Sequence, residues 1–231
     1  MPSDFLWDTK SQRYRYKDSG KFVSAEAVRN LNEKYIDQLK TDIGTIADKL
    51  VQGKINVATW EETTAKALKD LHIANFTLGR GGLKQVSARD YGIIGSELKK
   101  EYQYLRGFSQ DILAGKMSSA QLRDRVSKYV DSSYGTYELG RGESHRAAGY
   151  NWERRIRNAA VSCDSCVAYA AKGWQALGTL PNTGDECDCK SRCRCHKEYS
   201  NDHKRPTDSL LTAGWGFIGT QFDVLKNPLM G

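Results

Sequence analysis

The hydrophobic pattern after Ser24 is that of an amphipathic helix. Apolar side chains recur at a spacing of three or four residues, which places them on one helical face; they are Val28, Leu31, Tyr35, Leu39, Ile43, Ile46 and Leu50. Gly53 follows the last of them and favours a helix end. The pattern therefore predicts a first helix from Ser24 to Gly53.

Further helices are predicted by capping boxes, in which the first side chain and the one three residues later each bond a free backbone N–H. These pairs are Thr59 with Glu62, Ser87 with Asp90, and Ser118 with Gln121. A last helical stretch, from Glu143 to Ala160, carries a group of arginines. We expect helix to dominate residues 24–160.

The two ends of the chain lack this periodicity. Aromatic and β-branched residues flank a turn at residues 18–20, which predicts a short hairpin in an N-terminal arm, residues 1–23. Residues 200–231 contain turn formers and the aromatic residues Trp215, Phe217 and Phe222, and we expect an extended C-terminal tail there. The predicted fold is mainly α, with a helical domain at 24–160, a cysteine-rich module at 161–199 and this tail.

All six cysteines of the 231-residue chain lie in that module. They form a C-x2-C pair at Cys163 and Cys166 and two C-x-C pairs, Cys187/Cys189 and Cys193/Cys195, directly before His196. Thiolates at short spacing suit a tetrahedral zinc ion. Cys163 and Cys166 would act together, with partners among the other four cysteines and His196. One ion would leave some donors unused, whereas two ions would share the set.

Two other uses of the cysteines are possible in principle. The N-terminus shows no basic start followed by an apolar block, so we expect no secretory signal and a reducing cytosol, which favours metal over disulfides. Disulfide bonds remain the alternative if the mature protein is located outside the cell, for instance in a virus particle. A redox C-x-x-C is disfavoured because an arginine-rich stretch, interpreted as helical, precedes it.

The net charge of +7 favours a polyanionic partner. Residues 141–157 hold five arginines against two acids, and residues 190–205 hold six cations against two acids. If the chain binds nucleic acid, the expected phosphate contacts are Arg154, Arg155, Arg157, Arg192 and Arg194. The absence of a long apolar run argues against a membrane span.

The region from Arg141 to Cys195 resembles the C-terminal region of phage Mu F-like minor head proteins, the head morphogenesis family. The residues that carry the resemblance are Arg141-Gly142-Glu143, Ala147-Ala148-Gly149, Trp152, the Cys163/Cys166 pair, Gly178 to Pro181, and Cys193-Arg194-Cys195. The region spans 55 of the 231 residues. The family often has a histidine-proline pair before the last C-R-C, and here Cys189 takes that place.

The resemblance implies a structural zinc ion with ligands among Cys163, Cys166, Cys189, Cys193 and Cys195. It also implies a minor capsid protein that assists head assembly near the portal vertex, in the host cytoplasm first and then in the virion. Expected partners are the portal or major capsid protein and packaged double-stranded DNA. No enzyme activity, small-molecule substrate or membrane partner is expected. The alternative is a free nucleic-acid-binding zinc protein.

Overall fold

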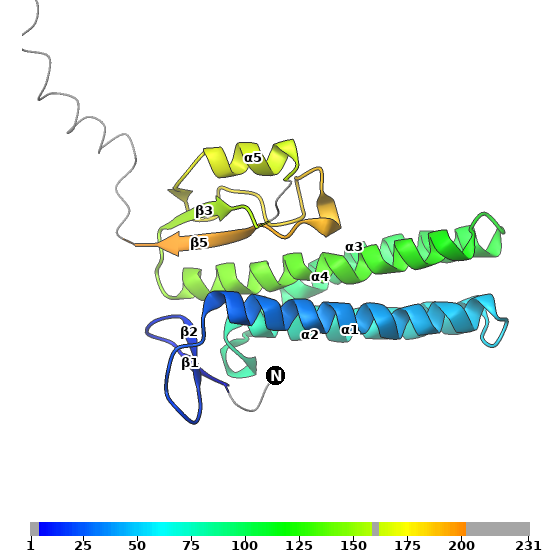
Figure 1. The fold of residues 1–231 in the computed structure, drawn as a ribbon, viewed down its shortest axis with the longest axis horizontal. Coiled ribbons are helices and arrows are strands. Elements are labelled where there is room, and N and C mark those ends of the chain that lie inside the picture. The colour runs from blue at the N-terminus through cyan, green and yellow to red at the C-terminus, as the bar shows by residue number, and fades with distance from the viewer. Residues whose placement is uncertain (1–4, 159–161, 202–231) are drawn as a thin grey trace, which may run out of the picture.

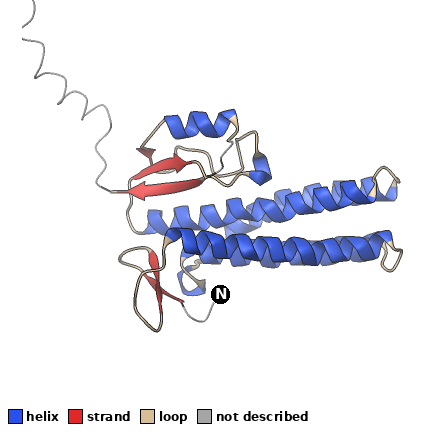
Figure 2. Ribbon diagram, in the orientation of Figure 1, coloured by secondary structure: helices blue, strands red, loops and turns tan. Residues whose placement is uncertain are grey.

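The computed structural model describes residues 5–158 and 162–201. Among these residues, four long helices dominate (Figures 1 and 2), which confirms the prediction of a mainly α fold. Their bounds are α1 Ala25–Val51, α2 Val57–Arg80, α3 Ala88–Leu113 and α4 Ser119–Ala147, with a short 3-10 turn, η1 Leu83–Gln85, between α2 and α3. The tail predicted for 200–231, including Trp215, Phe217 and Phe222, lies outside the described residues beyond position 201.

The helices begin where their capping side chains satisfy the first free N–H groups. Ser24 caps α1, and complete capping boxes start α3 at Ser87 and α4 at Ser118, as predicted. The predicted start of α2 at Thr59 is wrong. Asn56 caps that helix and accepts a hydrogen bond of 2.8 Å from the Thr59 N–H, because asparagine caps at least as well as threonine.

The centre of the bundle is the contact between α2 and α4, which is the most extensive between any two elements. Glycines on both helices allow it. A Cβ atom on Gly79 would collide with the backbone oxygen of Tyr137, and one on Gly140 with that of Phe76. α1 and α3 flank this pair and complete a core around Trp60 and other buried side chains.

The N-terminal arm packs on one end of the bundle (Figure 1). Strand β1, Phe5–Asp8, pairs with β2, Arg13–Tyr16, in an antiparallel hairpin. Beyond the turn predicted at residues 18–20, Phe22 forms an antiparallel bridge with Arg15, and the N–H groups of Tyr16 and Val23 donate to the carbonyls of Lys21 and Tyr14 at 2.9 and 2.8 Å. The Tyr14 hydroxyl donates a 2.8 Å hydrogen bond to the Leu78 carbonyl, so the arm caps the last turn of α2.

The helix predicted for Glu143 to Ala160 is wrong over most of its length. α4 ends at Ala147, Gly149 adopts a left-handed conformation with φ of 79°, and strand β3 follows at Trp152–Ile156. The inward side chains of β3 are Glu153 and Arg155, both 2% exposed. Because charged residues occupy the buried face, the strand lacks the apolar alternation that usually reveals one.

β3 is the central strand of a small antiparallel sheet that lies along the C-terminal half of α4 (Figure 1). Its neighbours are β4, Gln175–Ala176, and β5, His196–Ser200. Helix α5, Asp164–Ala171, and a second 3-10 turn, η2 Lys190–Arg192, complete this unit. We call residues 152–200 the C-terminal module.

The close approach of α2 and α4 predicts opposite effects for two glycine substitutions. Gly140→Ala should lower the free energy of unfolding by about 3 kcal/mol, because the methyl group meets backbone that cannot move aside. Gly95→Ala on α3, where no atom lies within 4 Å, should raise it by about 1 kcal/mol. Urea unfolding followed by circular dichroism measures both; a Gly140→Ala protein as stable as the wild type contradicts this packing.

Candidate metal centre

Cysteine fills the interior of the C-terminal module. Among its described residues, the buried apolar side chains are Leu180 and four cysteines: Cys166, Cys187, Cys193 and Cys195. A core of this size cannot stabilise an independent fold, and small domains of this kind are usually held by metal ions or disulfides. The cysteines are therefore the candidate functional group of this module.

Three segments bring the sulfur atoms together. Cys163 is the N-terminal cap of α5, and Cys166 lies in its first turn. Cys187 and Cys189 precede η2, where tight backbone hydrogen bonds, from Lys190 N–H to the Cys187 carbonyl and from Arg192 N–H to the Cys189 carbonyl, reverse the chain. Cys193 follows this turn, which places Cys187, Cys189 and Cys193 beside Cys166 of α5.

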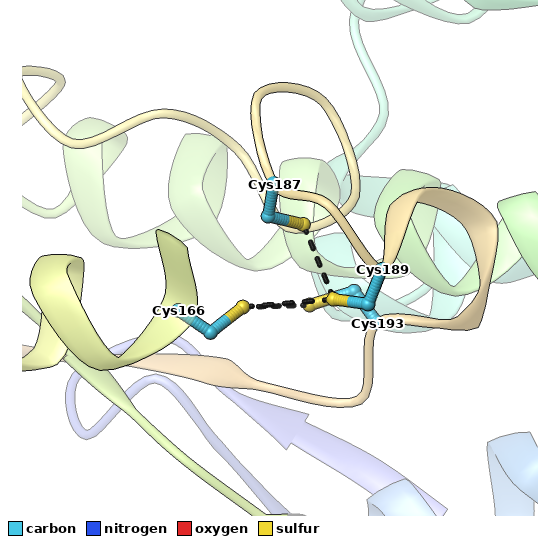
Figure 3. Close-up of side chains that lie close together, drawn as sticks. All are labelled: Cys166, Cys187, Cys189 and Cys193. Atoms are coloured by element: carbon cyan, nitrogen blue, oxygen red, sulfur yellow. Dashed lines mark hydrogen bonds between the residues drawn. The ribbon is translucent and has the colours of Figure 1, made fainter. Parts of the chain in front are cut away.

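Four of the sulfurs form a tight group. Those of Cys166, Cys187, Cys189 and Cys193 all lie within 4.8 Å of one another. Figure 3 shows Cys166 reaching from α5 toward the other three, which come from the loop around η2. These four side chains can hold a metal ion.

The sulfur separations favour a metal over disulfides. Cys189 lies 3.4 Å from Cys187, and Cys166 lies 3.6 Å from Cys189 and 3.7 Å from Cys193. A tetrahedron with metal–sulfur bonds of about 2.3 Å has edges of about 3.8 Å, whereas a disulfide bond is about 2.05 Å long. All six cysteines are free thiols.

The predicted ligand set overlaps this group in part. Cys166, Cys189 and Cys193 belong to it. Cys187 also belongs to it, although it was a candidate donor on spacing alone and not in the set that the resemblance implies. Cys163 lies outside the group of four but only 3.4 Å from Cys189. Cys195 is also outside it, buried, and close enough to Cys166 and Cys193 to change the pKa of both thiols.

His196, the remaining candidate donor, does not join the group. It begins β5, pairs with Ile156 of β3, and is 5% exposed. Burial and neighbouring arginines lower its pKa to about 3, so the ring is neutral at pH 7. All four donors of the group are therefore sulfur.

The cysteines differ in their readiness to ionise. Burial raises the pKa of Cys166, Cys187 and Cys189, because a thiolate is poorly solvated there. Burial also acts on Cys163, but hydrogen bonds from the backbone N–H groups of Cys166 and Cys189 outweigh it and lower its pKa to about 7. A bound cation would offset the desolvation of the other thiolates.

A buried charge network joins the module to α4. The Glu138 carboxylate, fully buried, accepts two 2.9 Å hydrogen bonds from Arg141 and one of 3.1 Å from the Lys197 backbone N–H. The Lys197 ammonium bonds Glu153 at 3.1 Å and the Leu180 carbonyl at 2.7 Å. Although burial opposes its charge, Glu138 raises the pKa of Arg141. We call these four charged residues the Glu138 network.

The C-R-C motif contributes to both the cluster and the contact with α4. Cys193 and Cys195 are buried on the cysteine side, while Arg194 between them forms an ion pair with Asp131 of α4. The Arg194 guanidinium also lies over the Tyr134 ring, 5.2 Å from its centroid. In an extended segment adjacent side chains point to opposite sides, so the two cysteines lie on the cluster side and Arg194 lies on the α4 side.

The structure changes the list of predicted phosphate contacts. Arg155 is 2% exposed and bonds Thr183 and the Pro181 carbonyl, so the prediction is wrong for this residue. Arg154 pairs with Glu198, Arg192 with Asp124 and Arg194 with Asp131. Arg157 is exposed, and phosphate binding by these four arginines stays a prediction.

The arginine-rich stretch before the C-x-x-C pair is not the helix that was expected. Among the described residues, the nearest regular element before Cys163 is strand β3, and the motif starts α5. However, β3 pairs only antiparallel with its neighbours, and four further thiols surround the pair. Thioredoxin-like motifs belong to a βαβ arrangement, so the surroundings favour metal binding.

An open cleft lies beside the cysteine cluster, between α3, α4 and the loop before η2. Its volume is about 780 Å³, and its lining includes Glu101, Tyr104, Arg125, Asp185 and Cys193. Burial raises the pKa of Glu101 to about 7 and lowers that of His72, also in the lining, to about 4. The sequence does not predict that Glu101 and His72 line the same cleft, because they belong to different helices. The prediction that the chain is not an enzyme stays a prediction.

Comparison with protein-family models, curated proteins and solved structures found no significant match to this chain. Within the part of the chain that the structure describes, no helix has the length and apolar character needed to cross a membrane.

The Glu138 network predicts that Glu138→Gln lowers the free energy of unfolding by about 3 kcal/mol, because Arg141 loses its buried counter-charge. The matched control is Glu198→Gln, which breaks the ion pair with Arg154, where both side chains are about two-fifths exposed. Its expected effect is within about 0.5 kcal/mol. Chemical unfolding of both variants tests this, and equal effects would rule out a special role for Glu138.

Proposed function

We propose that this chain is a structural minor head protein of a tailed phage, whose C-terminal module is held by zinc. It acts in head assembly near the portal vertex, in the host cytoplasm and then in the virion. The observation that carries the proposal is the convergence of four thiols in the segment that resembles head morphogenesis proteins.

The donor chemistry supports zinc and a structural role. Thiolates favour soft or borderline ions, and four thiolates in tetrahedral arrangement are typical of structural zinc. Catalytic zinc keeps one position for water or substrate. Cys166, Cys187, Cys189 and Cys193 would fill all four positions, so the site suits stabilisation of the module.

The residues that carry the family resemblance support the proposal because they make contacts within the module or between the module and α4. Arg141 belongs to the Glu138 network. The Leu180 carbonyl accepts from Lys197, and the Pro181 carbonyl accepts from Arg155. Cys193-Arg194-Cys195 supplies thiols to the cluster and an ion pair to α4. These positions therefore belong to one unit of the fold, the module together with the end of α4 that it contacts.

The proposed partners are the portal or major capsid protein, and packaged DNA is a secondary one. The alternative, a free nucleic-acid-binding zinc protein, has less support. Of its five expected phosphate contacts, Arg155 is buried and three others are already paired with acids. Phosphate contacts require cations that can reach the backbone of the nucleic acid.

Quantitative mass spectrometry of density-purified phage particles tests the proposal directly. We expect the chain at a low, fixed ratio to the portal protein, with the major capsid protein as internal standard. The same ratio should survive nuclease treatment, because the proposed attachment is to protein. A chain abundant in the lysate but missing from particles would contradict a role as a head component.

A further inference from the structure

Two cysteines remain outside the group of four, and both touch it. The Cys163 sulfur lies 3.4 Å from that of Cys189 and also hydrogen-bonds Cys166. Cys195 is 3% exposed and acts on the thiols of Cys166 and Cys193. The six sulfurs therefore form one continuous cluster around Cys166, which is fully buried.

We propose that the cluster binds two divalent metal ions, with the Cys166 and Cys189 thiolates bridging them. This rests on the zinc-held module proposed above and extends it. One ion takes Cys166, Cys187, Cys189 and Cys193. The second takes Cys163 and Cys195 together with the same two bridging sulfurs. Each ion then has four sulfur ligands, which is the coordination number that zinc prefers.

The contacts of the two bridging sulfurs carry this assignment. A bridging thiolate must neighbour a terminal ligand of each ion. The Cys189 sulfur does so, since it lies 3.4 Å from that of Cys187, a terminal ligand of the first ion, and 3.4 Å from that of Cys163, a terminal ligand of the second. Cys166 contacts Cys193 at 3.7 Å and also neighbours Cys163 and Cys195. The bridging pair itself is 3.6 Å apart, close to the tetrahedral edge of about 3.8 Å.

Cys193 also neighbours Cys195, but the backbone accounts for this contact. The two residues are two positions apart, directly before β5, and extended backbone places such side chains on one side. Each can therefore be a terminal ligand of a different ion. Cys193 belongs to the compact group of four, whereas Cys195 does not.

The second ion adds no net charge to the buried site. One Zn²⁺ with four thiolates carries a charge of −2, and two Zn²⁺ with six thiolates carry the same charge. When the second Zn²⁺ binds to the site that already holds one ion, the neutral thiols of Cys163 and Cys195 become thiolates and release two protons to solvent. Thus all six sulfurs become ligands without the desolvation cost of further charge.

Metal stoichiometry of the full-length chain, purified under reducing conditions with zinc, tests the proposal. We expect native mass spectrometry and elemental analysis to give two zinc ions per chain. Cys163→Ser combined with Cys195→Ser should leave one ion. The control Val167→Ser changes an exposed side chain on α5 beside Cys166, removes no sulfur, and should keep two.

A second measurement does not depend on variants that fold. With ¹¹³Cd in place of zinc, the wild-type chain should give two NMR resonances of equal intensity, coupled to each other through the shared sulfurs. One ion per chain with a single resonance would overturn the two-ion cluster and leave the single zinc site of the proposed function intact. No bound ion at all would overturn both.

Discussion

The C-terminal module must be held together without an ordinary apolar core, and the rest of its structure depends on how this is achieved. Among its described residues, the buried apolar side chains are four cysteines and Leu180, and they lie beside buried polar groups such as Glu153 and Arg155. Thiols packed against one another contribute little cohesion, whereas a metal ion bound by thiolates contributes about 10–16 kcal/mol of apparent binding energy. In this account the ion replaces the missing core. It fixes the start of α5 and the loop around η2 relative to β5, and thereby determines the sheet that meets α4.

The module and the helical bundle are coupled because the same short segments serve both. Arg194 lies between two cysteines of the cluster and pairs with Asp131 of α4. Lys197, two residues after Cys195, gives its backbone N–H to Glu138 and its ammonium to Glu153. A structural change in the cysteine cluster is therefore transmitted to α4 through Arg194 and Lys197. This coupling suits a structural protein, in which one rigid surface is built from two differently stabilised parts.

The sequence predicts features that arise locally and misses those that depend on distant contacts. Ser24, Ser87 and Ser118 each cap a helix through their own neighbours, so these starts can be predicted. β3 could not be predicted, because its buried face carries Glu153 and Arg155, whose partners lie more than twenty residues away. The cysteine spacing predicts a metal site but not its ligands. The turn at η2 brings Cys193 back beside Cys187 and Cys189, and this contact does not follow from the cysteine spacing.

The central claim is that metal holds the C-terminal module together. Hydrogen exchange measured by mass spectrometry on the zinc-loaded chain, and again after chelation in the presence of a reductant, tests it most directly. The account predicts that amides of α5, η2 and β5 lose protection when the metal is removed, while α1, α2 and α3 keep theirs. Unchanged protection across residues 162–200, in a sample shown by elemental analysis to be free of metal, would contradict it.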